Sequence, residues 1–139
     1  MRPVIAALLL LSGCVQATPP DIPPGAGSVE IFSGSGFIGS TTLKIYETDV
    51  FERTDQDPGE DPLTRFEQAP PGTYERVRAT LAAGVVAVAP ASFDTCPTDW
   101  PINLIRIDPP VRGVSSVEAG CEDNGFDALR AAVVADLPQ

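Results

Sequence analysis

Residues 41–54 read TTLKIYETDVFERT, and this stretch decides the fold class of the chain. In its first half, Leu43 and Ile45 alternate with the more polar residues at positions 44 and 46, a period of two that places apolar side chains on one face of a strand. A Thr48-Asp49 turn then leads into a second strand-like run over residues 50–54. The stretch therefore predicts a β-hairpin with one apolar face.

Further strands are predicted on both sides of this hairpin. Residues 29–32 form a first strand, and a Gly/Ser turn over residues 33–40 connects it to the hairpin. Residues 55–72 are rich in acids, Pro and Gly and predict a loop, with a short ordered piece around residues 63–66. Residues 102–107 and 114–120 are two more strand candidates, and Asp108-Pro109-Pro110 separates them because no α-helix persists there.

Two helices complete the predicted domain. Thr73 is a candidate cap for a helix that ends at Gly84, and its apolar positions recur at helical spacing at Tyr74, Val77 and Leu81. Residues 85–89 either extend that helix or form a short strand, and Pro90 ends it in both cases. Asn124 is a candidate cap for a last helix, whose apolar face comprises Phe126, Leu129, Val133 and Leu137. This order of elements predicts an α+β fold: a small, mostly antiparallel sheet with two helices packed on one face.

The N-terminus resembles an export signal. One basic residue, a short apolar run and the sequence Leu11-Ser12-Gly13-Cys14 resemble the lipobox of bacterial lipoproteins. The run is too short to span a bilayer, which takes roughly 20 apolar residues. An ordinary cleaved signal with a chance Cys and a buried helix are the alternatives.

The lipoprotein resemblance implies a domain plan. Residues 1–13 are a signal peptide, residues 14–27 are a lipidated Cys14 and a Pro-rich tether, and residues 28–139 are a single domain. It also implies a lipid anchor in the cell envelope. Val15 stands where many Gram-negative lipoproteins that stay in the inner membrane have Asp, so the outer membrane is the expected location.

The pairing of the other two cysteines follows from the same resemblance. Once Cys14 is assigned to lipid, Cys96 and Cys121 are an even pair in an oxidising compartment, which implies a disulfide. Such a bond would stabilise the fold by roughly 3 kcal/mol in the chain-entropy model.

Charge and composition exclude several functions. The formal net charge is −10, so neither nucleic acid nor anionic lipid head groups are expected partners. The chain has no His, which excludes His-based catalytic triads and His-ligated zinc. Nothing indicates a cofactor or a catalytic residue.

Two motifs have ordinary explanations. The pattern Gly34-x-Gly36-x-x-Gly39 precedes a β-branched, aromatic run and not a helix, so it is interpreted as a turn between strands and not as a nucleotide-binding loop. Carboxylates at Asp55, Asp57 and Asp61 offer oxygen ligands for Ca²⁺, but the spacing is not that of a calcium loop. They are weak metal candidates within a solvated acidic loop.

The densest group of unusual residues surrounds the only Trp. Asp94, Asp99 and Trp100 are candidate binding residues beside Cys96. The alternative is that Trp100 packs against the disulfide as a core or partly buried residue, which is the commoner arrangement.

Residues 29–137 also loosely resemble a family of small, uncharacterised bacterial secreted domains. The resemblance rests on the hairpin, the central helix, Thr98-Asp99, Gly120-Cys121 and the closing helix, and it implies no activity. The leading hypothesis is a non-catalytic envelope lipoprotein that binds another envelope protein and meets the membrane through its lipid. The alternatives are an inhibitor of a lysozyme-like hydrolase, for which an acidic surface is suited, and a Ca²⁺-binding or carboxylate-dependent enzyme.

Overall fold

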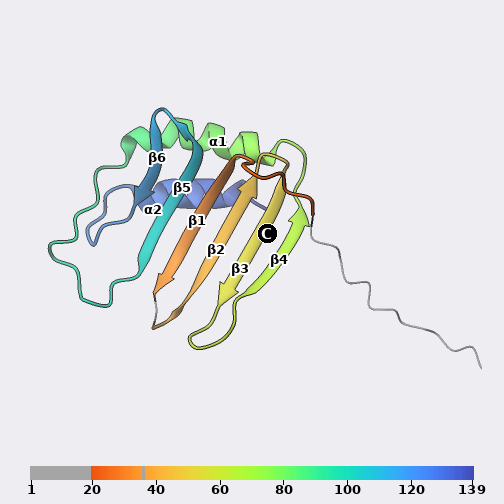
Figure 1. Cartoon of the computed structure of the whole chain (residues 1–139). Coiled ribbons are helices and arrows are strands. Elements are labelled where there is room, and N and C mark those ends of the chain that lie inside the picture. The colour runs from red at the N-terminus through yellow and green to blue at the C-terminus, as the bar shows by residue number, and fades with distance from the viewer. Residues whose placement is uncertain (1–19, 36) are drawn as a thin grey trace, which may run out of the picture.

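The structure, a computed structural model, describes residues 20–35 and 37–139 (Figure 1). Six strands form one sheet in the order β4-β3-β2-β1-β5-β6, and every neighbouring pair is antiparallel. The elements in chain order are β1 (Ser28–Ser35), β2 (Gly39–Tyr46), β3 (Val50–Gln56), β4 (Leu63–Gln68), α1 (Thr73–Gly84), the short 3₁₀ helix η1 (Val85–Ala87), β5 (Ile102–Val111), β6 (Val114–Glu118) and α2 (Phe126–Ala135).

The predicted hairpin is confirmed as β2 and β3. Ile45 pairs with Phe51 and Lys44 with Glu52, so apolar and polar side chains alternate across the two strands. Asp49 in the turn has φ of 58°, a left-handed conformation that Asp tolerates better than most residues. This alternation gives the sheet one apolar and one polar face.

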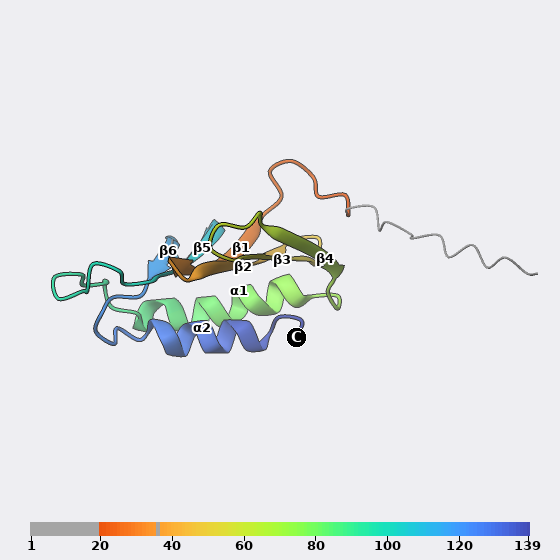
Figure 2. The ribbon, with the colours of Figure 1, turned by 90° about the horizontal axis from the view of Figure 1, so that it is seen from below.

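The apolar face of the sheet meets the helices. Figure 2 shows α1 and α2 on the same side of the sheet, and no helix of the described residues lies on the opposite side. The antiparallel sheet, the two helices and the α+β class are confirmed, although strand residues clearly outnumber helical ones. One core cluster joins the layers, with Val29, Ile31, Ile45, Ile105 and Ile107 from the sheet and Val77, Leu81, Phe126, Leu129 and Val133 from the helices.

The cap of α1 comes from another part of the chain. Thr73 does not cap the helix, because its hydroxyl donates to the carbonyl of Pro70 instead. The carboxylate of Asp49, in the β2–β3 turn, accepts hydrogen bonds from the backbone N–H groups of Gly72 (2.7 Å) and Tyr74 (2.8 Å). A negative charge at a helix N-terminus is stabilising, so this contact joins the hairpin to the helix.

The start of α2 agrees more closely with the sequence. Gly125 is the N-cap residue, in a left-handed conformation, and the side chain of Asn124 accepts from the N–H of Phe126 at 3.3 Å. Leu137 is buried as predicted but lies beyond the end of the helix.

Several boundaries were predicted wrongly: β1 extends to Ser35, beyond the predicted residues 29–32, and β6 ends at Glu118 and not at residue 120. The expected loop over residues 55–72 contains a complete edge strand, β4, and the ordered piece around residue 63 is its beginning. Asp108-Pro109-Pro110 does not end its strand, since β5 runs on to Val111. The ladder between β5 and β6 shifts register between Arg106 and Val111, because proline has no N–H to donate to it.

The predicted signal peptide and lipobox, including Cys14, lie outside the described residues. The carbonyl of Gly27 accepts from the N–H of Glu47 at 2.9 Å, directly before β1 begins. No helix in the described ranges is long and apolar enough to cross a membrane.

Candidate functional site

The loop between η1 and β5 is fastened at three points. The N–H of Ala89 donates to the carbonyl of Asn124 at 2.9 Å, and the N–H of Cys121 donates to the carbonyl of Ser92 at 3.1 Å. The third point is the disulfide between Cys96 and Cys121, which confirms the pairing expected from the sequence, with Cα atoms 5.4 Å apart. A loop without regular structure is thereby held against the end of β6.

This loop and β5 line an open apolar hollow of about 400 Å³. Phe93, Trp100 and Ile102 are exposed by 53, 39 and 58%, while Leu104 is only 9% exposed. Ile102 and Leu104 alternate with inward-facing residues on β5, so they lie on the face of the sheet that the helices leave free. The hollow is lined by Phe93, Cys96, Trp100, Pro101, Ile102, Asn103, Leu104, Glu118 and Ala119.

The predicted binding residues are partly brought together here. Trp100 lines the hollow beside Cys96, but it is a wall of a surface depression and not a core residue. Asp94 and Asp99 are exposed and are not part of the lining. The carboxylate in the lining is Glu118, which sequence reasoning missed, and it pairs across the sheet with Leu104.

Ile102, Leu104 and Phe93 were also missed as site residues. The run Ile102-Asn103-Leu104-Ile105 contains apolar residues of both parities, a signal that both faces of this strand are partly covered. Phe93 lies in an irregular loop and carries no periodic signal. The hollow can accept an apolar side chain, with Glu118 available to a positive charge beside it.

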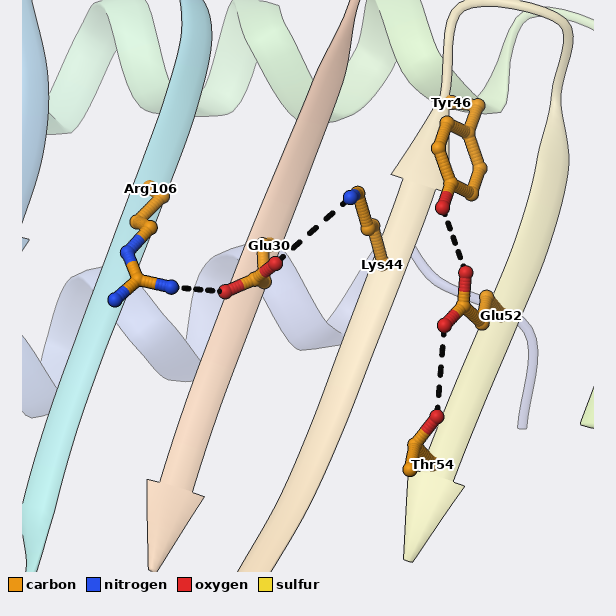
Figure 3. A network of polar contacts seen from close by, with 6 residues as sticks. All are labelled: Glu30, Lys44, Tyr46, Glu52, Thr54 and Arg106. Atoms are coloured by element: carbon orange, nitrogen blue, oxygen red, sulfur yellow. Dashed lines mark hydrogen bonds and ion pairs between the residues drawn. The ribbon is translucent and has the colours of Figure 1, made fainter. Parts of the chain in front are cut away.

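Beyond the hollow, the free face carries a network of polar contacts across β5, β1, β2 and β3 (Figure 3). The carboxylate of Glu30 accepts from Arg106 at 2.7 Å and lies 3.9 Å from the ammonium of Lys44. The hydroxyl of Tyr46 donates to Glu52 at 2.6 Å. Opposite charges alternate across four neighbouring strands, with the Glu30 side chain, shared by both ion pairs, partly buried between its partners.

Tyr46 is held in its neutral form by this arrangement. Burial raises the pKa of its hydroxyl well above the usual range, and the hydrogen bond to Glu52 and the negative charges of Glu52 and Glu30 raise that pKa further. No nucleophile with an activating base follows from these contacts, because the hydroxyl is a donor to a carboxylate and resists ionisation.

The acidic residues proposed as metal ligands do not converge. Asp55 accepts from Arg53 (2.8 Å) and from the hydroxyl of Thr41 (2.9 Å), and the hydrogen bond from Arg53 is the main reason that the pKa of Asp55 is lowered. Asp55 and Asp57 border a hollow of about 530 Å³ at the end of β3, whose lining does not include Asp61. Within residues 20–35 and 37–139, no three His, Cys, Asp or Glu side chains come together as metal ligands.

The glycine motif lies where two strands connect, as predicted, and a strand and not a helix follows it. The predicted turn over residues 33–40 was too long, because Gly34 lies in β1 and Gly39 begins β2, while Gly36 lies outside the described residues. An added Cβ at Gly34 would lie 2.5 Å from the carbonyl oxygen of Gly39, so this glycine serves close strand packing.

No protein-family model, no curated protein and no solved structure matches this chain.

Proposed function

We propose that this protein is a lipid-anchored envelope lipoprotein, placed in the outer membrane more readily than in the inner, whose folded domain is a non-catalytic module that binds another envelope protein. The observation that carries the binding role is the hollow around Trp100 and Ile102. The observation that supports the anchor is the sequence Leu11-Ser12-Gly13-Cys14.

The hollow favours a protein over a small molecule. Its three exposed apolar side chains line an open depression, whereas small-molecule sites bury most of the ligand surface. Exposed apolar clusters of this kind mark interaction sites on soluble domains. The carboxylate of Glu118 and the net charge of −10 favour a partner with basic residues around its apolar side chain.

The binding role is tested with Ile102→Asp in the full-length, lipidated protein. We expect the partner to co-purify with the wild-type protein from detergent-solubilised envelopes. We expect it to be lost with Ile102→Asp, because binding would then bury an unpaired carboxylate among apolar side chains. Val86→Asp is the matched control, since Val86 is 68% exposed but lies outside the lining. Recovery of the same partner in equal yield with Ile102→Asp would contradict the assignment.

The anchor is tested separately with Cys14→Ala. Wild-type protein should incorporate radiolabelled palmitate and partition into a detergent phase, and the variant should do neither, because one lipidated cysteine carries the whole anchor. A variant that still incorporates palmitate would contradict an anchor on Cys14. This outcome is independent of the binding role.

An inhibitor of a lysozyme-like hydrolase is a second candidate, favoured by the acidic charge, because lysozyme-like targets are commonly basic. A lytic assay with the full chain at micromolar concentration distinguishes it. Inhibition that Ile102→Asp abolishes and Val86→Asp retains would support it, and no inhibition would exclude it.

A further inference from the structure

One edge of the sheet is left open. All six residues of β4 are exposed, and within residues 20–35 and 37–139 it has one neighbouring strand, β3. The opposite edge differs, because the side chain of Asn124 donates to the carbonyl of Glu118 on β6 at 2.8 Å and the fastened loop lies next to it. Of the two edge strands, β4 is therefore the one whose outer N–H and C=O groups are accessible to another strand.

The charges on β4 select its partner. Arg65 and Glu67 are two residues apart and therefore point to the same face. In the described part of the chain, neither of them takes part in a salt bridge. A strand that pairs with β4 must offer the reverse order of charges, and an antiparallel second copy of β4 does so.

Hydrogen bonding restricts the possible registers. Along a strand, neighbouring residues direct their N–H and C=O groups to opposite sides, so only every second residue of β4 can bond to a new strand. Two identical antiparallel strands therefore form hydrogen bonds only when the two-fold axis lies midway between the two copies of one residue. An axis at Arg65 places Arg65 against Arg65, and an axis at Glu67 places Glu67 against Glu67. An axis at Phe66 places each Arg65 against the Glu67 of the other copy.

We propose that two copies of this chain associate through β4, antiparallel, with the two-fold axis at Phe66. The two six-stranded sheets then become one continuous sheet with all helices on the same side. The two Phe66 rings, each 38% exposed in a single copy, contact each other on the face away from the helices. Thr64 of each copy lies opposite Gln68 of the other.

Charge reversal tests this register in the full chain. Sedimentation equilibrium in density-matched detergent should give a dimer for the wild type. Glu67→Arg should raise the dimer dissociation constant about tenfold or more, because two attractive pairs become two repulsive ones. Arg65→Glu should do the same, and the double variant Arg65→Glu/Glu67→Arg should restore the wild-type constant. A monomeric wild type, or a double variant no better than the single ones, would overturn the proposal.

Cysteine cross-linking checks the pairing without altering charge. Thr64→Cys/Gln68→Cys should form dimers on a non-reducing gel under oxidising conditions, because opposed Cα atoms 4.5–5.5 Å apart suit a disulfide. Thr64→Cys alone is the matched control and should not cross-link, since in this register the two Thr64 positions are about 13 Å apart along the strands. Cross-linking of the control at equal yield would refute the register.

Discussion

Replacement of Asp49 should remove the contact between the β2–β3 turn and the N-terminus of α1 and lower the stability of the fold. Asp49→Ala removes the acceptor of two backbone N–H groups at the helix N-terminus and also places Ala at φ of 58°. Loss of a cap costs about 0.5–2 kcal/mol, loss of the negative charge about 0.3–1 kcal/mol, and a left-handed Ala about 1 kcal/mol. The free energy of unfolding should therefore fall by about 3 kcal/mol.

Urea unfolding with the disulfide intact measures this change. With an m-value of about 2 kcal/mol per M, the midpoint should fall by about 1.5 M. Asp49→Gly removes the cap without the backbone strain and should lose about 2 kcal/mol, and Asp49→Asn keeps one acceptor and should lose about 1 kcal/mol. Glu47→Ala, at an exposed position of the same turn, is the control and should change the midpoint little. The reasoning is refuted if Asp49→Gly is as stable as the wild type, or if Glu47→Ala costs as much.

Three further predictions concern the fastened loop and the two tyrosines, Tyr46 and Tyr74. Gly120→Ala places a Cβ 2.7 Å from the backbone oxygen of Ser92, so the fastened loop must move, and the melting temperature should fall by the equivalent of about 1–3 kcal/mol; an unchanged melting temperature would contradict this. Burial raises the pKa values of Tyr46 and Tyr74 in the folded state, so the stability they contribute is complete below about pH 10 and decreases as the pH rises above it. Glu52→Gln should lower the pKa of Tyr46, seen as earlier tyrosinate absorbance in an alkaline titration, and identical curves would show that Glu52 has no part in it.

The elements with one-sided burial were predictable. The alternation around Leu43 and Ile45 and the helical spacing of Val77 and Leu81 both reflect contact with one core, and the structure places all four there. The disulfide was predictable for a different reason, since it followed from counting cysteines.

The missed features depend on contacts between residues that are far apart in the sequence, or on a strand that buries neither of its faces. β4 is exposed on both faces, so no apolar alternation marks it, and it is recognisable only by its pairing with β3. Asp49 caps a helix that begins 24 residues later, and no local pattern connects the two. The hollow joins Phe93 of an irregular loop to a strand, which a single sequence does not reveal.

The central position of β1 has a consequence for how the chain folds. β1 to β4 follow one another in the chain and form a meander. The other side of β1 pairs with β5, which is much later in the sequence, and this pairing places Ile31 against Ile105. Pairing over so long a sequence separation is the slow step of a β-rich domain. Until β5 arrives, Val29 and Ile31 stand on an unpaired strand edge, so a chain that emerges from its N-terminus passes through a stage in which its most aggregation-prone edge is exposed.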